Sequence, residues 1–234
     1  MTSVEPILLS DSRIGAIAWA DDGDPLVDLR GGPLRLDRRL ADPVGAYARL
    51  RAGVVERLVA AQAALPAGLA LLIIEGYRPP ALQRDYFDEY LAQLQTTYPG
   101  WDAHRRRVEA SKFISPPEVA PHGTGGAVDL TLCTAAGTEL DLGTAVNASP
   151  EESRNACYTA APDISANARE LRDILVTALT GAGLVNYPTE WWHWSYGERY
   201  WALQQGLPRT RYAPVDVTTL VPAPSTADEA PTGG

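Results

Sequence analysis

The chain has 234 residues, of which 45% are hydrophobic and 21% are charged. This is an ordinary globular balance, and a chain of this length can bury a full core without disulfide bonds or structural metal ions. The net charge of -9 repels phosphate backbones and anionic membranes, so we expect no nucleic-acid partner and no membrane partner.

The first part of the chain is predicted to form two short strands and a long helix. The strands are expected at residues 14–19 and 25–30, because both are apolar and the acidic, glycine-containing stretch between them is typical of a turn. Asp42 followed by Pro43 is typical of a helix start, with a capping carboxylate and a proline at the first helical position. That helix should end at Pro66.

The middle of the chain is predicted to contain two strands and two helices. Residues 69–74 are a continuous apolar run between breakers, which indicates a buried strand. The prolines after this strand should start a helix that reaches about residue 97, and a basic helix containing residues 105–107 should follow. Residues 114–126 are too rich in proline and glycine for a regular element. The alternating residues 127–132 indicate the second strand.

The last part of the chain is predicted to hold a helix, a strand and a tail. Asp163 is the expected cap of an amphipathic helix, and the aromatic residues 190–196 favour a strand. The end of the chain has little to bury, so residues 1–212 are interpreted as one domain and residues 213–234 as a disordered tail. Strands and helices follow no regular β-α-β pattern, which predicts an α+β fold with a mainly antiparallel sheet flanked by helices.

The sequence shows no sign of export. Its first residues lack a basic segment followed by a long apolar core, and no apolar run approaches the ~20 residues that span a bilayer. We therefore expect a cytoplasmic protein. The two cysteines, Cys133 and Cys157, match no disulfide framework and no zinc-finger pattern, although one bridge between them stays open.

The first candidate metal-binding stretch is Pro-His-Gly-Thr-Gly-Gly-Ala-Val-Asp. It places His122 in a glycine-rich loop and Asp129 in the strand predicted at residues 127–132. Glycines let the backbone fold back tightly, so the imidazole and the carboxylate can converge on one point. Both groups are good zinc ligands. The alternative is structural, with a capping histidine in a turn and an aspartate that binds local amides.

The second candidate stretch is Glu-Trp-Trp-His-Trp at residues 190–194. His193 would be a third ligand, and three protein ligands leave a position open for water, as in catalytic zinc sites. Glu190 could accept a proton from that water and pass it to a leaving amine. On a regular strand, positions three apart face opposite ways, so both side chains serve one site only if the strand bends, bulges or ends there. The alternative is a buried aromatic strand with a hydrogen-bonded histidine.

The remaining reactive residue types give weaker signals. Arg78 follows an apolar strand in a Gly-Tyr-Arg-Pro turn, where it could stabilise the oxyanion of a tetrahedral intermediate or form a surface ion pair. His104 lies beside three arginines and is expected to be exposed. A cysteine peptidase would need Cys133 or Cys157 activated by a histidine, and nothing near Cys133 favours a thiolate.

Four sequence blocks together resemble the zinc D-alanyl-D-alanine dipeptidases of the vancomycin-resistance (VanX-like) type. The blocks are Glu-Gly-Tyr-Arg-Pro at 75–79, Pro-His-Gly-Thr-Gly-Gly-Ala-Val-Asp-Leu-Thr-Leu at 121–132, Asp-Leu-Gly-Thr at 141–144 and Glu-Trp-Trp-His at 190–193. The resemblance spans most of residues 10–212. It depends mainly on the pairing of a His-x-x-Gly-x-Ala-x-Asp block with a distant Glu-x-x-His block.

The resemblance implies an α+β fold whose antiparallel sheet carries one zinc ion per chain. It implies His122, Asp129 and His193 as the zinc ligands. It further implies Glu190 as the general acid and base, and Arg78 as the group that stabilises the transition state. The implied substrates are small dipeptides, chiefly D-Ala-D-Ala, whose hydrolysis removes a cell-wall precursor or recycles D-alanine.

Three residues are candidates for substrate binding, namely Tyr77, Ala120 and Asn147. Ala120 stands where the family usually has serine, and Asn147 stands where the family often has an aspartate that pairs with the substrate ammonium. Asparagine can accept a hydrogen bond but brings no charge, which weakens the expectation of strict dipeptide specificity. Glu151 or Glu152 could substitute for the missing carboxylate.

Two alternatives to a dipeptidase stay open. One is a D,D-carboxypeptidase that acts on longer cell-wall peptides, which Asn147 favours and the lack of an export signal opposes. The other is a zinc-binding domain that no longer catalyses. Retention of both Glu190 and Arg78 opposes it, because a structural zinc site needs neither.

Overall fold

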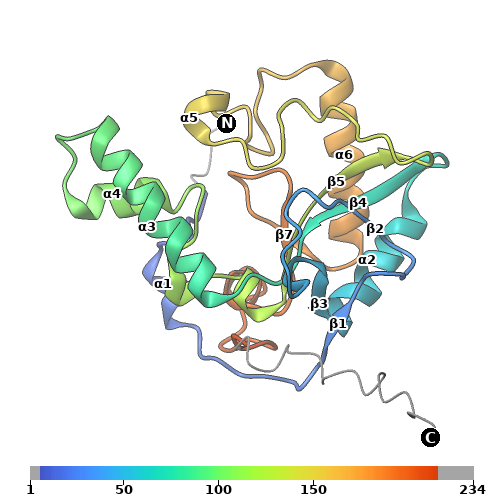
Figure 1. Cartoon of the computed structure of the whole chain (residues 1–234), viewed down its shortest axis with the longest axis horizontal. Coiled ribbons are helices and arrows are strands. Elements are labelled where there is room, and N and C mark those ends of the chain that lie inside the picture. The colour runs from blue at the N-terminus through green and yellow to red at the C-terminus, as the bar shows by residue number, and fades with distance from the viewer. Residues whose placement is uncertain (1–5, 216–234) are drawn as a thin grey trace, which may run out of the picture.

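The computed structural model describes residues 6–215, which form a mixed sheet with helices packed around it (Figure 1). The larger sheet has the strand order β2-β4-β5-β7-β6, and β1 pairs with β3 in a small second sheet. The strands are β1 (Leu26–Asp28), β2 (Arg35–Leu36), β3 (Arg49–Arg51), β4 (Leu69–Glu75), β5 (Ala127–Thr134), β6 (Val185–Asn186) and β7 (His193–Ser195). In the larger sheet β2 and β4 are parallel and the other neighbours are antiparallel. This confirms the predicted α+β fold with a mainly antiparallel sheet.

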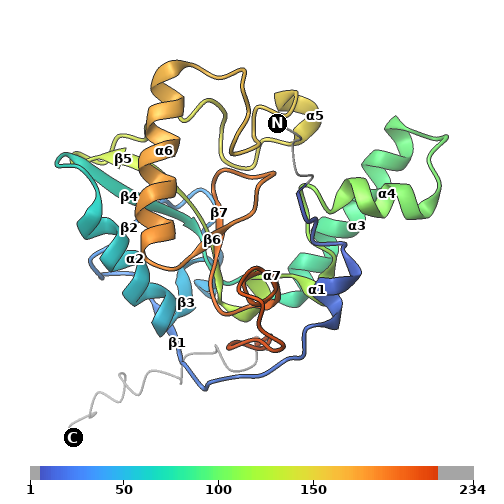
Figure 2. The ribbon, with the colours of Figure 1, turned by 180° about the vertical axis from the view of Figure 1, so that it is seen from behind.

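Two pairs of helices lie on opposite sides of the molecule. Figure 2 shows α6 and α2 together against the strands, whereas α3 and α4 lie on the other side. The α-helices are α1 (Ser12–Ala16), α2 (Ala52–Ala64), α3 (Pro80–Thr97), α4 (Ala103–Ala110), α5 (Pro150–Ser153), α6 (Ala166–Gly181) and α7 (Arg199–Gln204). Three 3-10 turns, η1 (Ala46–Ala48), η2 (Pro117–Val119) and η3 (His122–Thr124), interrupt the loops.

The main core lies between the sheet and the helices α2 and α6. Val128 and Leu130 of β5 are fully buried and belong to one apolar cluster with Leu58 of α2 and Leu175 of α6. Successive side chains of a strand point to opposite faces, so Asp129 points away from this cluster. The sheet thereby buries apolar side chains on one face and presents a carboxylate on the other.

Several predicted elements are confirmed. The strand predicted at residues 69–74 is β4, the strand predicted at 127–132 is the first part of β5, and the strand predicted at 25–30 contains β1. The proline-initiated helix is α3 and the basic helix is α4. None of the helices that the structure describes has the length and apolar character needed to cross a bilayer.

Two predictions near the N-terminus were wrong. Residues 14–19 form no strand, because Asp11 caps α1 by accepting from the N–H of Arg13 at 2.9 Å. The long helix does not begin at Asp42 but at Ala52. The carboxylate of Asp42 instead accepts from the N–H groups of Val44 and Tyr47, which closes a local turn before the chain enters β3.

Two boundaries in the last third differ from the prediction as well. The cap of α6 is Ser165 rather than Asp163, since the Ser165 hydroxyl accepts from the N–H of Ala168 at 3.1 Å. The strand predicted at residues 190–196 is limited to β7, because the preceding residues form a tight turn. Most of the tail predicted at 213–234 lies outside the described residues.

Candidate active site

Strand register and the loop before β5 bring three of the predicted site residues to one end of the larger sheet. Asp129 of β5 pairs with His193 of β7 on one side and with Glu75 of β4 on the other. His122 lies in η3, in the glycine-rich loop that leads into β5. The loop turns back through Gly125, which has a φ of 69° that disfavours residues with a side chain.

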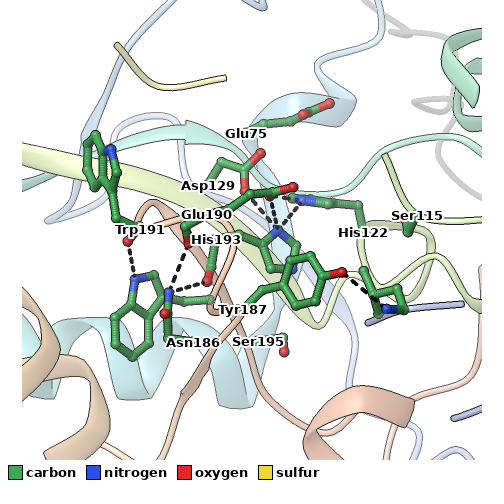
Figure 3. A network of polar contacts seen from close by, with 12 residues as sticks. Glu75, Ser115, His122, Asp129, Asn186, Tyr187, Glu190, Trp191, His193 and Ser195 are labelled. Atoms are coloured by element: carbon green, nitrogen blue, oxygen red, sulfur yellow. Dashed lines mark hydrogen bonds and ion pairs between the residues drawn. The ribbon is translucent and has the colours of Figure 1, made fainter. Parts of the chain in front are cut away.

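Two histidines and one aspartate converge on a single point. Figure 3 shows the side chains of His122, Asp129 and His193 turned toward one another. Nδ1 of His193 lies 3.0 Å from Oδ1 of Asp129 and 3.1 Å from Nε2 of His122, and Nε2 of His122 lies 3.3 Å from the same Asp129 oxygen. All three residues are buried, and they form a group that could hold a metal ion.

The protonation of these groups suits metal binding. Nδ1 of His122 lies 2.7 Å from the carbonyl oxygen of Gly76, so it donates its proton there and leaves Nε2 as a lone-pair donor. Burial lowers the pKa of His193, which favours the neutral imidazole. Burial alone would raise the pKa of Asp129, but His122 and His193 beside it hold that pKa well below its usual range. Asp129 is therefore ionised, as a carboxylate that binds a metal ion must be.

Glu190 reaches the same point from a turn rather than from a strand. Its N–H donates to the carbonyl of Tyr187, and the N–H of His193 donates to the Glu190 carbonyl, so β7 begins only at His193. Oε2 of Glu190 then lies 3.8 Å from Nδ1 of His193. Burial raises the pKa of Glu190 well above its usual value, and the charge of Asp129 raises it further. A carboxylate with a raised pKa can accept and release a proton near neutral pH.

Arg78 approaches from the turn after β4. Its Nε donates to Oε1 of Glu75 at 2.9 Å, its Nη2 pairs with Oε2 of Glu75, and Nη2 lies 4.0 Å from Oδ2 of Asp129. Burial opposes the charge of Arg78, but the carboxylates of Glu75 and Asp129 raise its pKa above the usual range. The guanidinium is thus a permanent cation beside the convergence point, and the surface ion pair considered as an alternative is not what the structure shows.

These side chains line one cavity of about 260 Å³. Drug-sized ligands occupy pockets of roughly 300–1,000 Å³, so this cavity suits a smaller molecule. Its walls are formed by residues from the N-terminal segment, β4, α3, the loops, β5 and β7. They are Leu9, Leu40, Glu75, Arg78, Tyr86, Phe113, Ile114, Ser115, His122, Asp129, Asn147, Glu190 and His193. A larger groove of about 680 Å³ between α2 and α6 contains none of the candidate residues.

The three predicted substrate-binding residues are not brought together. Asn147 lies on the cavity wall, in a left-handed conformation with a φ of 65°. Tyr77 and Ala120 are buried and are not among the residues that line the cavity in the described part of the chain. Glu151 accepts a hydrogen bond from the Tyr90 hydroxyl, outside the cavity wall.

Several residues in or beside the cavity had no predicted role. Glu75 opens the first sequence block, but nothing in the sequence shows that its carboxylate pairs with Arg78. Gln83 contacts Arg78 from α3, where a glutamine among polar residues gives no signal. Ser115 lies in a stretch that was expected only to be irregular. His104 is exposed, as predicted.

The cysteines play no part in this cavity. Both are buried and free, and burial raises the pKa of each thiol. A nucleophilic cysteine needs a lowered pKa, so the geometry gives no support to a cysteine peptidase.

Comparisons with known proteins identify the family. The profile of Peptidase_M15, described as D-ala-D-ala dipeptidase, matches residues 47–211. A Synechocystis protein named D-alanyl-D-alanine dipeptidase is 28% identical over 66% of this chain and 72% of its own length. An Escherichia coli protein of the same name is 29% identical over 54% of each chain, so this chain spans about half of that relative.

Two solved structures show a weak likeness. One is VanYB in complex with D-alanine-D-alanine, at 17% identity and a TM-score of 0.36, covering 82% of this chain and 94% of that one. The other is a mutant of the vancomycin-resistance D,D-pentapeptidase VanY in complex with Zn(II), at 16% identity and a TM-score of 0.35, covering 82% and 95%. Because the family profile matches well over half of the chain and includes the three residues of the candidate metal site, the protein belongs to the D-Ala-D-Ala dipeptidase family.

Proposed function

We propose that the protein is a zinc-dependent dipeptidase that hydrolyses D-Ala-D-Ala or a similar small dipeptide. The observation that supports it most directly is the convergence of His122, Asp129 and His193 beside a buried Glu190 and a partly buried Arg78. Family membership supports the substrate class. The expected cytoplasmic location, a small dipeptide as partner and a domain spanning residues 1–212 belong to the same proposal.

The donor set fits zinc in number, chemistry and spacing. In a tetrahedral site with metal–ligand distances of ~2.0–2.1 Å, ligand atoms lie about 3.3 Å apart. The three atoms of His122, Asp129 and His193 are separated by 3.0, 3.1 and 3.3 Å. Three protein ligands leave one position free, which is typical of a catalytic site. We therefore assign one zinc ion per chain, which would supply a Lewis acid that acidifies water and polarises a peptide carbonyl.

Glu190 is assigned the proton transfers. Its carboxylate lies within 3.8 Å of His193, and its raised pKa lets it accept a proton from the attacking water. The same group can then deliver that proton to the amine that leaves when the peptide bond breaks. A domain that only binds zinc needs no such carboxylate, so the buried Glu190 favours catalysis over the non-catalytic alternative.

Arg78 is assigned the stabilisation of negative charge. During hydrolysis the carbonyl oxygen of the substrate becomes an oxyanion, and fixed donors near that position lower the barrier. The guanidinium lies 4.0 Å from Asp129 and is held by Glu75 along its Nε–Nη2 edge. It is therefore placed before the substrate arrives, so that it costs no reorganisation during the reaction.

One observation supports the alternative function as a D,D-carboxypeptidase. The cavity shares Tyr86, Phe113 and Ile114 with a neighbouring hollow of about 200 Å³, so a longer peptide has room to continue past these residues. Asn147 on the cavity wall brings no charge for a free substrate ammonium. The roles of Tyr77 and Ala120 in substrate binding remain predictions, for which the geometry offers no support.

Digests of three substrates distinguish these functions. The zinc-loaded protein is incubated with D-Ala-D-Ala, with N-acetyl-D-Ala-D-Ala and with a muramyl-type pentapeptide, and the products are identified by mass spectrometry. A dipeptidase releases D-alanine fastest from the free dipeptide, whereas a carboxypeptidase prefers the pentapeptide. If none of the three is cleaved by protein that carries zinc, the proposed function is wrong. Glu190→Gln serves as the control for contaminating peptidases.

A further inference from the structure

The hydrogen bonds of Arg78 divide its guanidinium into a fixed edge and a free edge. A guanidinium carries five N–H donors. Nε and Nη2 donate to the two oxygens of Glu75, and Nη1 donates to Oε1 of Gln83 at 2.9 Å. Among the described residues this leaves one N–H on each Nη atom, and Nη2 is the atom that lies 4.0 Å from Asp129. Two donors are thus left for the cavity.

Gln83 is itself held in one orientation. It lies in the first turns of α3, with 1% of its surface exposed. Its Nε2 donates to the carbonyl oxygen of Ser115 at 2.9 Å and lies 3.3 Å from the Ser115 hydroxyl. A carbonyl can only accept and a guanidinium can only donate, so the amide must turn its oxygen to Arg78 and its nitrogen to Ser115. The loop at Ser115 therefore fixes the acceptor that faces Arg78.

The two partners restrain Arg78 from different sides. Glu75 pairs with the Nε edge, and a carboxylate fork alone restrains only that edge. Asp129 lies close enough to attract the cation directly, and a direct pair would compete with a metal ion for the Asp129 carboxylate. The bond from Nη1 to Gln83 opposes that movement, because Gln83 is anchored on α3 and on the loop at Ser115.

We propose that Gln83 is a positioning residue for the hydrolytic reaction, which holds the guanidinium of Arg78 so that its two free N–H groups face the oxyanion position. Gln83 touches no reacting atom and acts through Arg78, with Ser115 as its anchor. The inference rests on the proposed function, since it assumes that Arg78 stabilises charge during hydrolysis.

A double-mutant cycle tests this role on the zinc-loaded protein. Gln83→Met keeps the length of the side chain and removes both the acceptor and the donor. We expect kcat for D-Ala-D-Ala to fall about 10- to 100-fold, as for a misplaced catalytic group, with KM and zinc content nearly unchanged. Gln95→Met, an exposed position on α3, is the matched control and should leave kcat as it is.

The decisive comparison is made in the Arg78→Ala background. A residue that acts only through Arg78 has nothing to position there, so adding Gln83→Met should cause no further loss of kcat. If the losses of the two substitutions multiply instead, Gln83 contributes to folding or to another contact, and the inference is overturned.

A second measurement needs no turnover. In nitrogen-edited NMR spectra of the wild-type protein, the Nη1 hydrogen of Arg78 that is donated to Gln83 should exchange slowly with water. Rapid exchange in the wild type, or the same slow exchange in Gln83→Met, contradicts the inference. If the wild type cleaves no peptide but Arg78 is protected as described, the proposed function fails while the restraint by Gln83 stands.

Discussion

Oε2 of Glu190 lies 3.8 Å from Nδ1 of His193, although the two residues are separated by a tight turn and only the second belongs to a strand. The side-chain amide of Asn186 stabilises this turn by donating to the carbonyl oxygens of both Glu190 and His193, each at 3.0 Å. The turn rotates Glu190 onto the face of the sheet that carries Asp129. A proton acceptor and the metal-binding group therefore share one cavity.

Glu190→Gln should keep zinc and lose nearly all turnover. Glutamine has almost the same shape as glutamate but cannot accept and release a proton. General acid–base groups typically contribute ~10²–10⁴-fold to a rate, so we expect a fall in kcat of that order. Elemental analysis and steady-state kinetics on the same preparation measure both quantities. Glu170→Gln, at an exposed position on α6, is the control. Near wild-type turnover in Glu190→Gln would show that another residue is the catalytic base.

The two buried histidines and the exposed histidine should differ in metal binding. His122→Ala and His193→Ala each remove one of the three ligand atoms that lie 3.0–3.3 Å apart, so the purified variants should carry little zinc. His104→Ala should keep about one zinc per chain, since His104 is exposed on α4. Retention of zinc by both buried-site variants would show that the metal is bound elsewhere.

Gly76→Ala should lower the affinity for zinc, because Gly76 orients the candidate ligand His122. The carbonyl oxygen of Gly76 accepts from Nδ1 of His122, which directs Nε2 toward the metal position. A methyl group at residue 76 would collide with the carbonyl oxygen of Arg49, so the backbone must shift. Loss of such an orienting contact typically costs ~10–100-fold in metal affinity. Competition with a fluorescent zinc chelator measures this, and an unchanged affinity would mean that His122 is oriented by other contacts.

The sequence predicted the elements and residues whose signals are local. The apolar run of β4 and the alternating residues of β5 predict the two central strands, because both patterns are typical of buried strands. His122 and Asp129 are candidates from sequence because glycines and ligand types lie within one short stretch. His193 and Glu190 are candidates through their spacing and the family resemblance. The turn that brings them together depends on Asn186, which has no signal in the sequence.

The features that the sequence missed depend on contacts between distant segments. Gln83 and Ser115 are separated by 32 positions, and neither residue type is unusual in its local context. Asp42 has the local signature of a helix cap, but the pairing of β3 with β1 delays the helix to Ala52. Long-range pairing of this kind overrides a capping preference that contributes only ~1 kcal/mol.

Asn147→Asp should sharpen the preference for a free amino terminus. Asn147 has a φ of 65°, a conformation that both asparagine and aspartate tolerate, so the substitution changes charge with little strain. A charge-assisted hydrogen bond to an ammonium is roughly twice as strong as a neutral one. We expect kcat/KM to rise for D-Ala-D-Ala and to fall for its N-acetyl form. If neither value changes, another group on the cavity wall binds the amino group of the substrate.

We expect hydrolysis of D-Ala-D-Ala to require a zinc ion held by His122, Asp129 and His193. The most direct test is to measure release of D-alanine by the purified protein, by the same protein after zinc has been removed with a chelator, and after zinc has been added back. We predict that activity is lost on removal and returns with about one zinc per chain, and that His193→Ala is not restored. Full activity in the zinc-free protein, or no activity in the zinc-loaded protein, would contradict a zinc-dependent hydrolysis of D-Ala-D-Ala.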